Sequence, residues 1–125
     1  MSETFEPFYI FEHPSFNDVY DAQRQSRLYG FRFRAEHTKY ETLCHQLKQR
    51  VSKATLEEYL ATPLEAVPDN SALYIVRIRP EGRESILPAL LAEALALGFV
   101  VHDDYRGQCH CPEGVWTVDG LRPHE

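Results

Sequence analysis

The C-terminal third of the chain constrains the fold most, because short apolar runs there flank one helical pattern. The run ALYIVRIRP (Ala72–Pro80) is apolar on both faces in its first half, which is typical of a central strand. A Leu/Ala-rich pattern follows, with Ser85 as a candidate N-cap, Pro88 then in the first turn, and Gly98 closing the helix. Two further strands, Phe99–His102 and Gln108–Cys111, flank a turn at residues 104–107. We therefore expect a βαββ-like unit, compatible with a ferredoxin-like or related split layer.

The rest of the chain alternates helical and strand patterns. Proline at position 7 should move the first strand to a sheet edge or delay its start to Phe8. Two Thr-x-x-Glu capping boxes, at Thr38 and Thr55, predict the starts of two helices. A short strand over residues 115–118 should precede five frayed C-terminal residues. The remaining predicted elements are a strand at 5–13, helices at 15–30, 38–52 and 55–62, a short strand at 31–35 and a loop at 62–70.

Length and composition indicate one domain over residues 1–125 of class α+β, with a mainly antiparallel sheet and helices packed on one face. At 125 residues the chain suits a single core, and 43% hydrophobic with 26% charged residues is an ordinary globular composition. No secretory leader and no membrane span is predicted. The odd set Cys44, Cys109 and Cys111 favours reduced thiols and hence a cytoplasmic protein.

Charge is unevenly distributed along this acidic chain. The segment Arg24–Lys53 holds eight basic and two acidic residues, so it carries +6 while the remainder carries −12. Such a distribution can steer a charged partner to one face. Alternatively, folding brings the basic and acidic residues together, or the charges lie on solvated helix faces, and neither arrangement implies a charged partner.

The densest set of ligand-type side chains is His102-Asp103-Asp104 with Cys109-His110-Cys111, which a hairpin would place on facing strands. A site in this hairpin would use His102, Asp103, Cys109 and Cys111. These types suit a metal site or a Cys-His catalytic pair, and this small enzyme or metal protein is one alternative function. Against a metal site, the C-x-C spacing departs from the usual zinc patterns. Against a Cys-His catalytic pair, nothing in the sequence indicates the oxyanion donors that such a site needs. The other interpretation has buried cysteines acting as small apolar residues, with His102 and Asp103 exposed at a turn. We favour it, and predict no catalytic residue, metal or cofactor.

The segment Arg24–Arg34 interleaves arginine with aromatic residues, which suits phosphate contact and base stacking. A nucleic-acid binder using Arg27, Arg32 and Arg34 is therefore a second alternative. Against it, an isoelectric point near 5.5 lacks the basic character expected of such proteins.

The closing pattern resembles the ends of small bacterial immunity proteins, which neutralise toxins delivered between cells. The similarity is in a Leu/Ala helix ending at Gly98, then Phe-Val-Val-His-Asp, a turn with Gly107, and Cys-Pro-Glu-Gly at 111–114. Asp103-Asp104-Tyr105 stands where that family typically has Asp-Pro-Gln. The resemblance implies a stoichiometric inhibitor and not a catalyst.

We therefore expect a small cytoplasmic binding protein that inhibits or escorts a protein partner, such as a basic toxin or enzyme, through an acidic surface. The aromatic residues of this surface would serve as interface anchors. The predicted contact residues are Glu57, Glu58, Asp103, Asp104, Tyr105 and Trp116.

Overall fold

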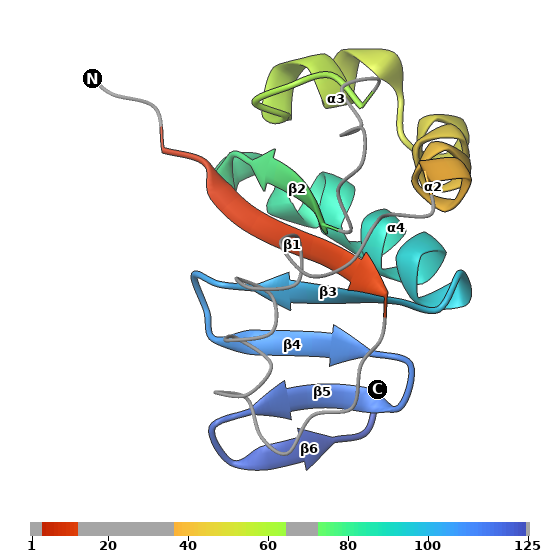
Figure 1. The fold of residues 1–125 in the computed structure, drawn as a ribbon. Coiled ribbons are helices and arrows are strands. Elements are labelled where there is room, and N and C mark those ends of the chain that lie inside the picture. The colour runs from red at the N-terminus through yellow and green to blue at the C-terminus, as the bar shows by residue number, and fades with distance from the viewer. Residues whose placement is uncertain (1–3, 13–36, 65–72, 125) are drawn as a thin grey trace.

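Six strands form one antiparallel sheet in the order β2-β1-β3-β4-β5-β6 in the computed structural model, which describes residues 4–12, 37–64 and 73–124 (Figure 1). The predicted α+β class is confirmed. The strands are β1 (Glu6–Glu12), β2 (Leu73–Ile78), β3 (Phe99–Asp103), β4 (Gln108–Cys111), β5 (Gly114–Thr117) and β6 (Gly120–Arg122).

One side of the sheet, formed by β2, β1 and β3, is a split βαβ unit. Strands β2 and β3 both pair antiparallel with β1, so they run parallel to each other with β1 between them. Helix α4 (Arg83–Ala96) connects them, preceded by the short 3-10 helix η1 (Pro80–Gly82). Strands β3 to β6 then continue as a meander through successive hairpins. The predicted βαββ-like unit is thus β2, α4, β3 and β4.

Two predictions about strand position need correction. Strand β2 was expected to be central but is an edge strand, and residues after helix α3 (Lys53–Tyr59) cover part of its outer edge. There the Ala61 N–H donates to the Arg77 carbonyl at 3.0 Å, which protects the exposed ladder. Strand β1, in contrast, is interior. Its Pro7 is tolerated because the β3 ladder ends opposite Phe8, so Pro7 has a paired residue on β2 alone.

The main core lies between the sheet and the described helices α2 (His37–Arg50), α3 and α4 (Figure 1). The Tyr40 hydroxyl donates to the Ile10 carbonyl at 3.0 Å, and its ring stacks on Phe99 at 4.8 Å. Helix α2 and the residue that follows it bury an apolar stripe: Tyr40, Leu43, Cys44, Leu47 and Val51. A second cluster occupies the opposite face of the sheet, where Phe11, Val100, Cys109 and Cys111 are fully buried. Strand alternation therefore buries both faces of the central strands.

The helix starts differ from those predicted. Ser52, not Thr55, caps α3, because its hydroxyl oxygen accepts from the Thr55 N–H at 3.2 Å. Helix α2 already includes His37, so Thr38 lies inside its first turn. Helix α4 begins at Arg83, which places Ser85 within the helix and Pro88 in its second turn, where Pro88 is exposed. Gly98 ends α4 with φ 83°, as predicted.

The C-terminal residues are more ordered than expected. The predicted strand at 115–118 is β5, and β6 pairs with it over residues 120–122. A ring nitrogen of His124 lies 2.7 Å from the Cys111 carbonyl oxygen. The predicted helix at 15–30 and strand at 31–35, with residues 65–70 of the loop, lie outside the described residues. None of the helices in the described ranges has the length and apolar character of a membrane span.

Candidate functional site

The turn between β3 and β4, at Asp104–Gly107, is held by its preceding aspartate. Oδ1 of Asp103 accepts a hydrogen bond from the Arg106 backbone N–H at 3.1 Å. This is the local side-chain-to-backbone bond that Asp supplies in tight turns. Gly107 adopts φ 64°, which closes the turn in the left-handed region. We call these four residues, Asp104, Tyr105, Arg106 and Gly107, the 104–107 turn.

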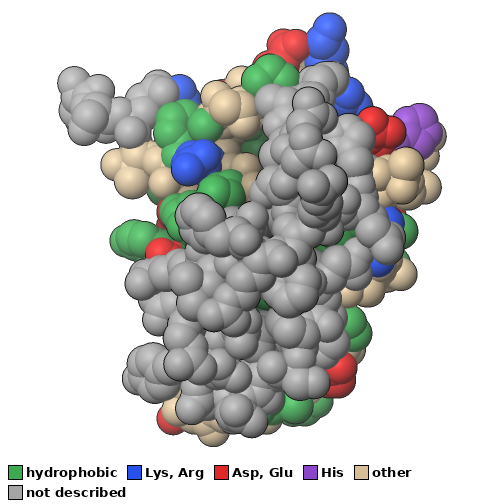
Figure 2. Space-filling model, in the orientation of Figure 1, with side chains coloured by type: hydrophobic (Ala, Val, Ile, Leu, Met, Phe, Trp, Pro, Cys, Tyr) green, Lys and Arg blue, Asp and Glu red, His purple; other side chains and the backbone are tan. Residues whose placement is uncertain are grey.

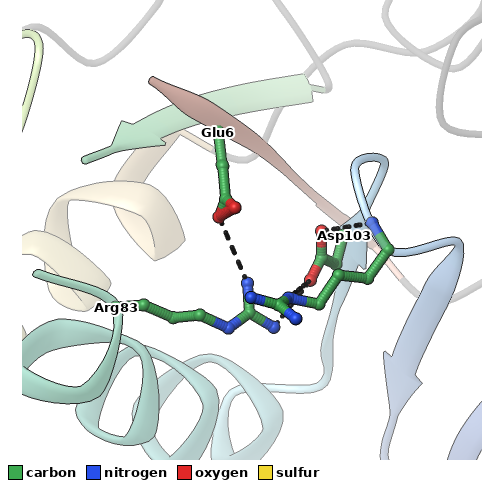
Figure 3. Close-up of polar contacts among 4 residues, drawn as sticks. Glu6, Arg83 and Asp103 are labelled. Atoms are coloured by element: carbon green, nitrogen blue, oxygen red, sulfur yellow. Dashed lines mark hydrogen bonds and ion pairs between the residues drawn. The ribbon is translucent and has the colours of Figure 1, made fainter. Parts of the chain in front are cut away.

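A buried ion cluster fixes the base of this turn (Figure 3). Nη2 of Arg83 lies 2.8 Å from Oδ2 of Asp103, and its Nη1 lies 3.5 Å from Oε2 of Glu6. The side chains of Asp103, Glu6 and Arg83 are 0%, 4% and 18% exposed, respectively. Nε of Arg106 approaches Asp103 at 3.9 Å from the solvent side. Buried charges are stable only when paired, so the cluster strongly favours one arrangement.

The cluster joins three parts of the chain that are distant in sequence. Glu6 is the first residue of β1, Arg83 the first of α4 and Asp103 the last of β3. The Arg83 guanidinium also lies 5.4 Å from the centroid of the Phe8 ring, a cation–π contact. The 104–107 turn is therefore attached to the centre of the fold.

The outer side of the turn presents an aromatic residue to solvent. Tyr105 is 69% exposed, although most large apolar side chains in the described residues are buried. Arg106 beside it is about half exposed, and Asp104 is 23% exposed. Asp104 also lies 3.6 Å from Nε2 of the buried His102. An exposed Tyr-Arg pair on a fixed turn is a typical protein-contact arrangement.

The structure divides the predicted acidic contact surface. Asp103 was expected on the surface but is completely buried, because Arg83 returns from α4 to pair with it. Glu57 and Glu58 are exposed on α3. The last residue of α3 lies at the same end of the sheet as the turn, since its carbonyl accepts from the N–H of Arg79, just before η1.

Trp116 lies on β5, the strand next to the hairpin that carries the 104–107 turn. It is half-buried against the second apolar cluster and pairs across strands with Cys109. Of the two aromatic residues in the predicted set, Tyr105 is thus the exposed one.

Three of the four metal-type residues of the hairpin share one face of the sheet, and the fourth does not. His102 pairs with Cys109, and Cys111 follows Cys109 by two residues, whereas Asp103 points to the other face. The expectation that His102 and Asp103 are exposed at a turn is wrong, since both are fully buried. Within residues 4–12, 37–64 and 73–124, no three His, Cys, Asp or Glu side chains form a group suited to a metal.

The ionisable groups of β4 are affected mainly by their neighbours and by burial. The hydrogen bond between the two thiols keeps a proton on Cys109 and raises its pKa, and burial raises it further. Burial lowers the pKa of His110 to about 4, although the nearby Asp103 carboxylate opposes that shift. The same hydrogen bond lowers the pKa of Cys111, so burial of this thiol, and not its pKa, opposes its reaction. The lowered pKa of His110 disfavours an imidazolium at neutral pH.

Folding brings opposite charges together in the described part of the basic segment. Arg50 pairs with Glu93 at 3.2 Å and Lys53 with Glu57 at 3.8 Å. Lys39 lies over the Phe99 ring. Figure 2 shows acidic and basic side chains next to one another over α2 and α3. Arg50 and Lys53 thus have partners of opposite sign, and the Lys53–Glu57 pair also lies on a solvated helix face, at 89% and 68% exposure. Arg24, Arg27, Arg32 and Arg34 lie outside the described residues.

Sequence reasoning missed Glu6, Arg83 and Arg106. The spacing of Asp103 and Arg106 is a usable signal, since an aspartate often accepts from the backbone N–H two or three positions later. Arg83 and Glu6 carry no comparable local signal, because their roles depend on tertiary contacts.

Comparison with known proteins gives no relative. No family model matches the sequence, and no curated protein or solved structure matches it. The resemblance to bacterial immunity proteins stays a prediction.

Proposed function

We propose that this is a small non-catalytic binding protein that inhibits or neutralises a protein partner, with the 104–107 turn as its main contact. The observation that supports this is the 69% exposure of Tyr105 on a turn held by the buried Arg83–Asp103 pair. The resemblance to immunity proteins favours the same class.

Preorganisation is the physical reason for choosing this turn. Tyrosine and arginine are enriched among the residues that contribute most to protein interfaces. Binding loses less entropy when the contact loop is already fixed. Here Asp103 fixes the backbone at Arg106 and Tyr105 projects outward. In this proposal Asp103 is a positioning residue and does not contact the partner.

The exposed acids at the same end would provide attraction to a basic partner. Glu57, Glu58 and Asp104 remain accessible or partly accessible. Complementary charges mainly increase the association rate, and their effect declines with salt. The partner would therefore be a basic enzyme or toxin, met in the cytoplasm, where the free thiols of Cys44, Cys109 and Cys111 stay reduced.

Affinity capture with matched variants tests the proposal. The tagged protein, Tyr105→Ala and Val118→Ala would each be incubated with a lysate of the source organism and the bound proteins identified by mass spectrometry. Val118 is a suitable control because it is 70% exposed on the separate β5–β6 turn. We expect one stoichiometric, salt-sensitive partner that Val118→Ala retains and Tyr105→Ala loses.

Purified partner then allows the association rate to be measured at low and high salt. Asp104→Lys should slow association at low salt, and equal capture by Tyr105→Ala would contradict the proposed contact. Near-equimolar zinc or iron without any protein partner would instead favour the metal alternative.

A further inference from the structure

Strand β6 ends the sheet, and no strand of the described residues pairs with its outer edge (Figure 1). The Gly120 carbonyl accepts from the Thr117 hydroxyl of β5 at 3.3 Å. A Cβ at Gly114 would overlap the Arg122 carbonyl, so this carbonyl also faces β5. Backbone groups alternate in direction along a strand that pairs on one side. The N–H and the carbonyl of Leu121 therefore point away from β5, towards the outer edge.

The side chains beside this edge are exposed as well. Leu121 is 46% exposed and pairs across strands with the half-buried Trp116. Asp119 and Arg122 pair with each other at 3.0 Å, but their side chains are 69% and 62% exposed. Such a pair contributes little stability, so each of the two groups can exchange its partner at small cost.

We propose that this edge pairs with the same edge of a second copy of the chain, through two antiparallel β6 strands related by a two-fold axis at Leu121. In this register the two Leu121 residues lie opposite each other and exchange two N–H···O=C hydrogen bonds. Their side chains meet on the face of the sheet that carries Trp116, where cross-strand apolar contacts stabilise the pair.

The charges of β6 fit a second copy of the same strand. In this register Arg122 lies opposite Gly120 of the second copy and next to its Asp119. Two ion pairs between the copies can therefore replace the two internal ones, and the arrangement is the same on both sides of the axis. An extended segment of another protein would satisfy the backbone groups of Leu121, but it would have to supply both charges at this spacing.

The extent of β6 limits the size of this interface. Pro123 has no N–H, so the ladder cannot continue beyond the end of the strand. The contact is smaller than the roughly 1,000 Å² of a stable interface, and the dimer is accordingly weak. The opposite edge of the sheet, at β2, is partly covered by residues 60–61, so pairing ends at the dimer. The inference is independent of the proposed inhibitor function, because it uses neither Tyr105 nor a foreign protein.

Sedimentation equilibrium of the full chain between about 10 µM and 1 mM tests the proposal in the range expected of a weak interface. We expect a monomer–dimer equilibrium, with chemical shifts at the Leu121 amide and the Trp116 indole that grow with concentration. Leu121→Lys places two like charges at the axis and should weaken the dimer at least about tenfold. Ala92→Lys is the matched control, because it adds the same charge at an exposed apolar position on α4, and it should leave the dimer unchanged.

Two charge variants test whether the partner is a second copy bound at this edge. Arg122→Glu makes the edge acidic and Asp119→Lys makes it basic, so each alone should weaken self-association about three- to tenfold. An equimolar mixture of the two variants should associate more tightly than either alone, and unchanged melting temperatures would show that both are folded.

An equal loss in Ala92→Lys, or a mixture no tighter than its components, would overturn the proposal. A chain that stays monomeric at about 1 mM would also overturn it and leave the edge to an extended segment of another protein.

Discussion

The guanidinium of Arg83 lies 2.8 Å from the carboxylate of Asp103, which joins the first residue of α4 to the last residue of β3. One buried contact thus connects the helix, the central sheet and the 104–107 turn. The substitution Asp103→Asn separates the energetic importance of this contact from that of the turn's hydrogen bond. It removes the negative charge that pairs with Arg83, but the asparagine side chain retains an oxygen that accepts from the Arg106 N–H.

Asp103→Asn should destabilise the fold by about 2 to 4 kcal/mol, since it leaves a largely buried guanidinium with Glu6 as its remaining acidic partner. Urea unfolding monitored by circular dichroism measures this change. Asp119→Asn is the matched control, because Asp119 also pairs with an arginine, Arg122 at 3.0 Å, but both are well exposed. Its effect should stay within about 0.5 kcal/mol. Equal losses in the two variants would contradict the structural importance of the cluster.

Acid should destabilise the protein through His110. Its pKa is about 4 in the folded chain and 6.5 when unperturbed, so the unfolded state binds more protons between these values. Stability contributed by neutral His110 is therefore complete above pH 6.5 and is lost as pH falls towards 4, amounting to about 1 to 2 kcal/mol by pH 5.

Urea midpoints at pH 7.5 and pH 5 measure this effect. The decrease on acidification should be smaller in His110→Gln than in the wild type. The exposed His45 provides the control, and His45→Gln should keep the wild-type decrease. If the urea midpoint of His110→Gln fell on acidification by as much as that of the wild type, other groups would cause the pH dependence.

Ser52→Ala should cost about 1 kcal/mol, because it removes the oxygen that accepts from the Thr55 N–H at the start of α3. Ser85 is an exposed residue inside α4, so Ser85→Ala should change stability by less than about 0.5 kcal/mol. Thermal unfolding of the two variants compares the observed cap of α3 with the residue that the sequence pattern predicted as the cap of α4. An unchanged stability in Ser52→Ala would contradict the cap of α3, and a loss of about 1 kcal/mol in Ser85→Ala would place the cap of α4 at Ser85.

The three thiols should react slowly in the native protein. Cys109 and Cys111 are completely buried and Cys44 is 6% exposed, so reagents cannot reach the three thiols in the folded chain. The pKa of Cys109 is raised by its hydrogen bond with Cys111, and that of Cys111 is lowered by the same bond, so burial is the main protection of Cys111. A colorimetric thiol reagent should detect no rapid reaction at pH 7 and three equivalents in urea. Rapid labelling of a single cysteine at pH 6 would instead support the Cys-His enzyme alternative.

Gly82→Ala should destabilise the protein by about 1 to 3 kcal/mol, because an added Cβ would overlap the Tyr59 ring. Gly98→Ala provides a contrast, since nothing lies near its Cβ position and only its φ of 83° opposes the change, at about 1 kcal/mol. Denaturant unfolding measures both. The loss in Gly82→Ala should shrink when Tyr59 is also changed to Ala, whereas the loss in Gly98→Ala should not.

Local patterns predicted much of the fold. The helix at 38–52, the end of α4 at Gly98 and the 104–107 turn all depend on neighbouring residues, and each is confirmed. The starts of α3 and α4 were misplaced, because Ser, Thr and Glu recur near these helices and several positions satisfy the capping pattern. Tertiary context selects among them.

The candidate site was less predictable. Tyr105 was correctly placed on a turn, but Asp103 was expected in solvent because its neighbours are polar. Its burial depends on Arg83, twenty residues earlier, and on Glu6, which only the sheet order brings near. The edge position of β2 has the same origin, since its apolar sequence does not show that β1 lies on one side and residues 60–61 on the other.

The position of β1 has a consequence for the order of folding. Phe8 pairs with Val76 and with Asp103, so the first described strand meets its neighbours only across long stretches of chain. Such contacts of high sequence separation carry a large loop-closure cost and slow folding. During synthesis, β1 must wait for β2 and β3 to leave the ribosome before the centre of the sheet can form. The β3–β6 meander, whose hairpins are local, has no such delay, so we expect it to become ordered before the sheet is closed around β1.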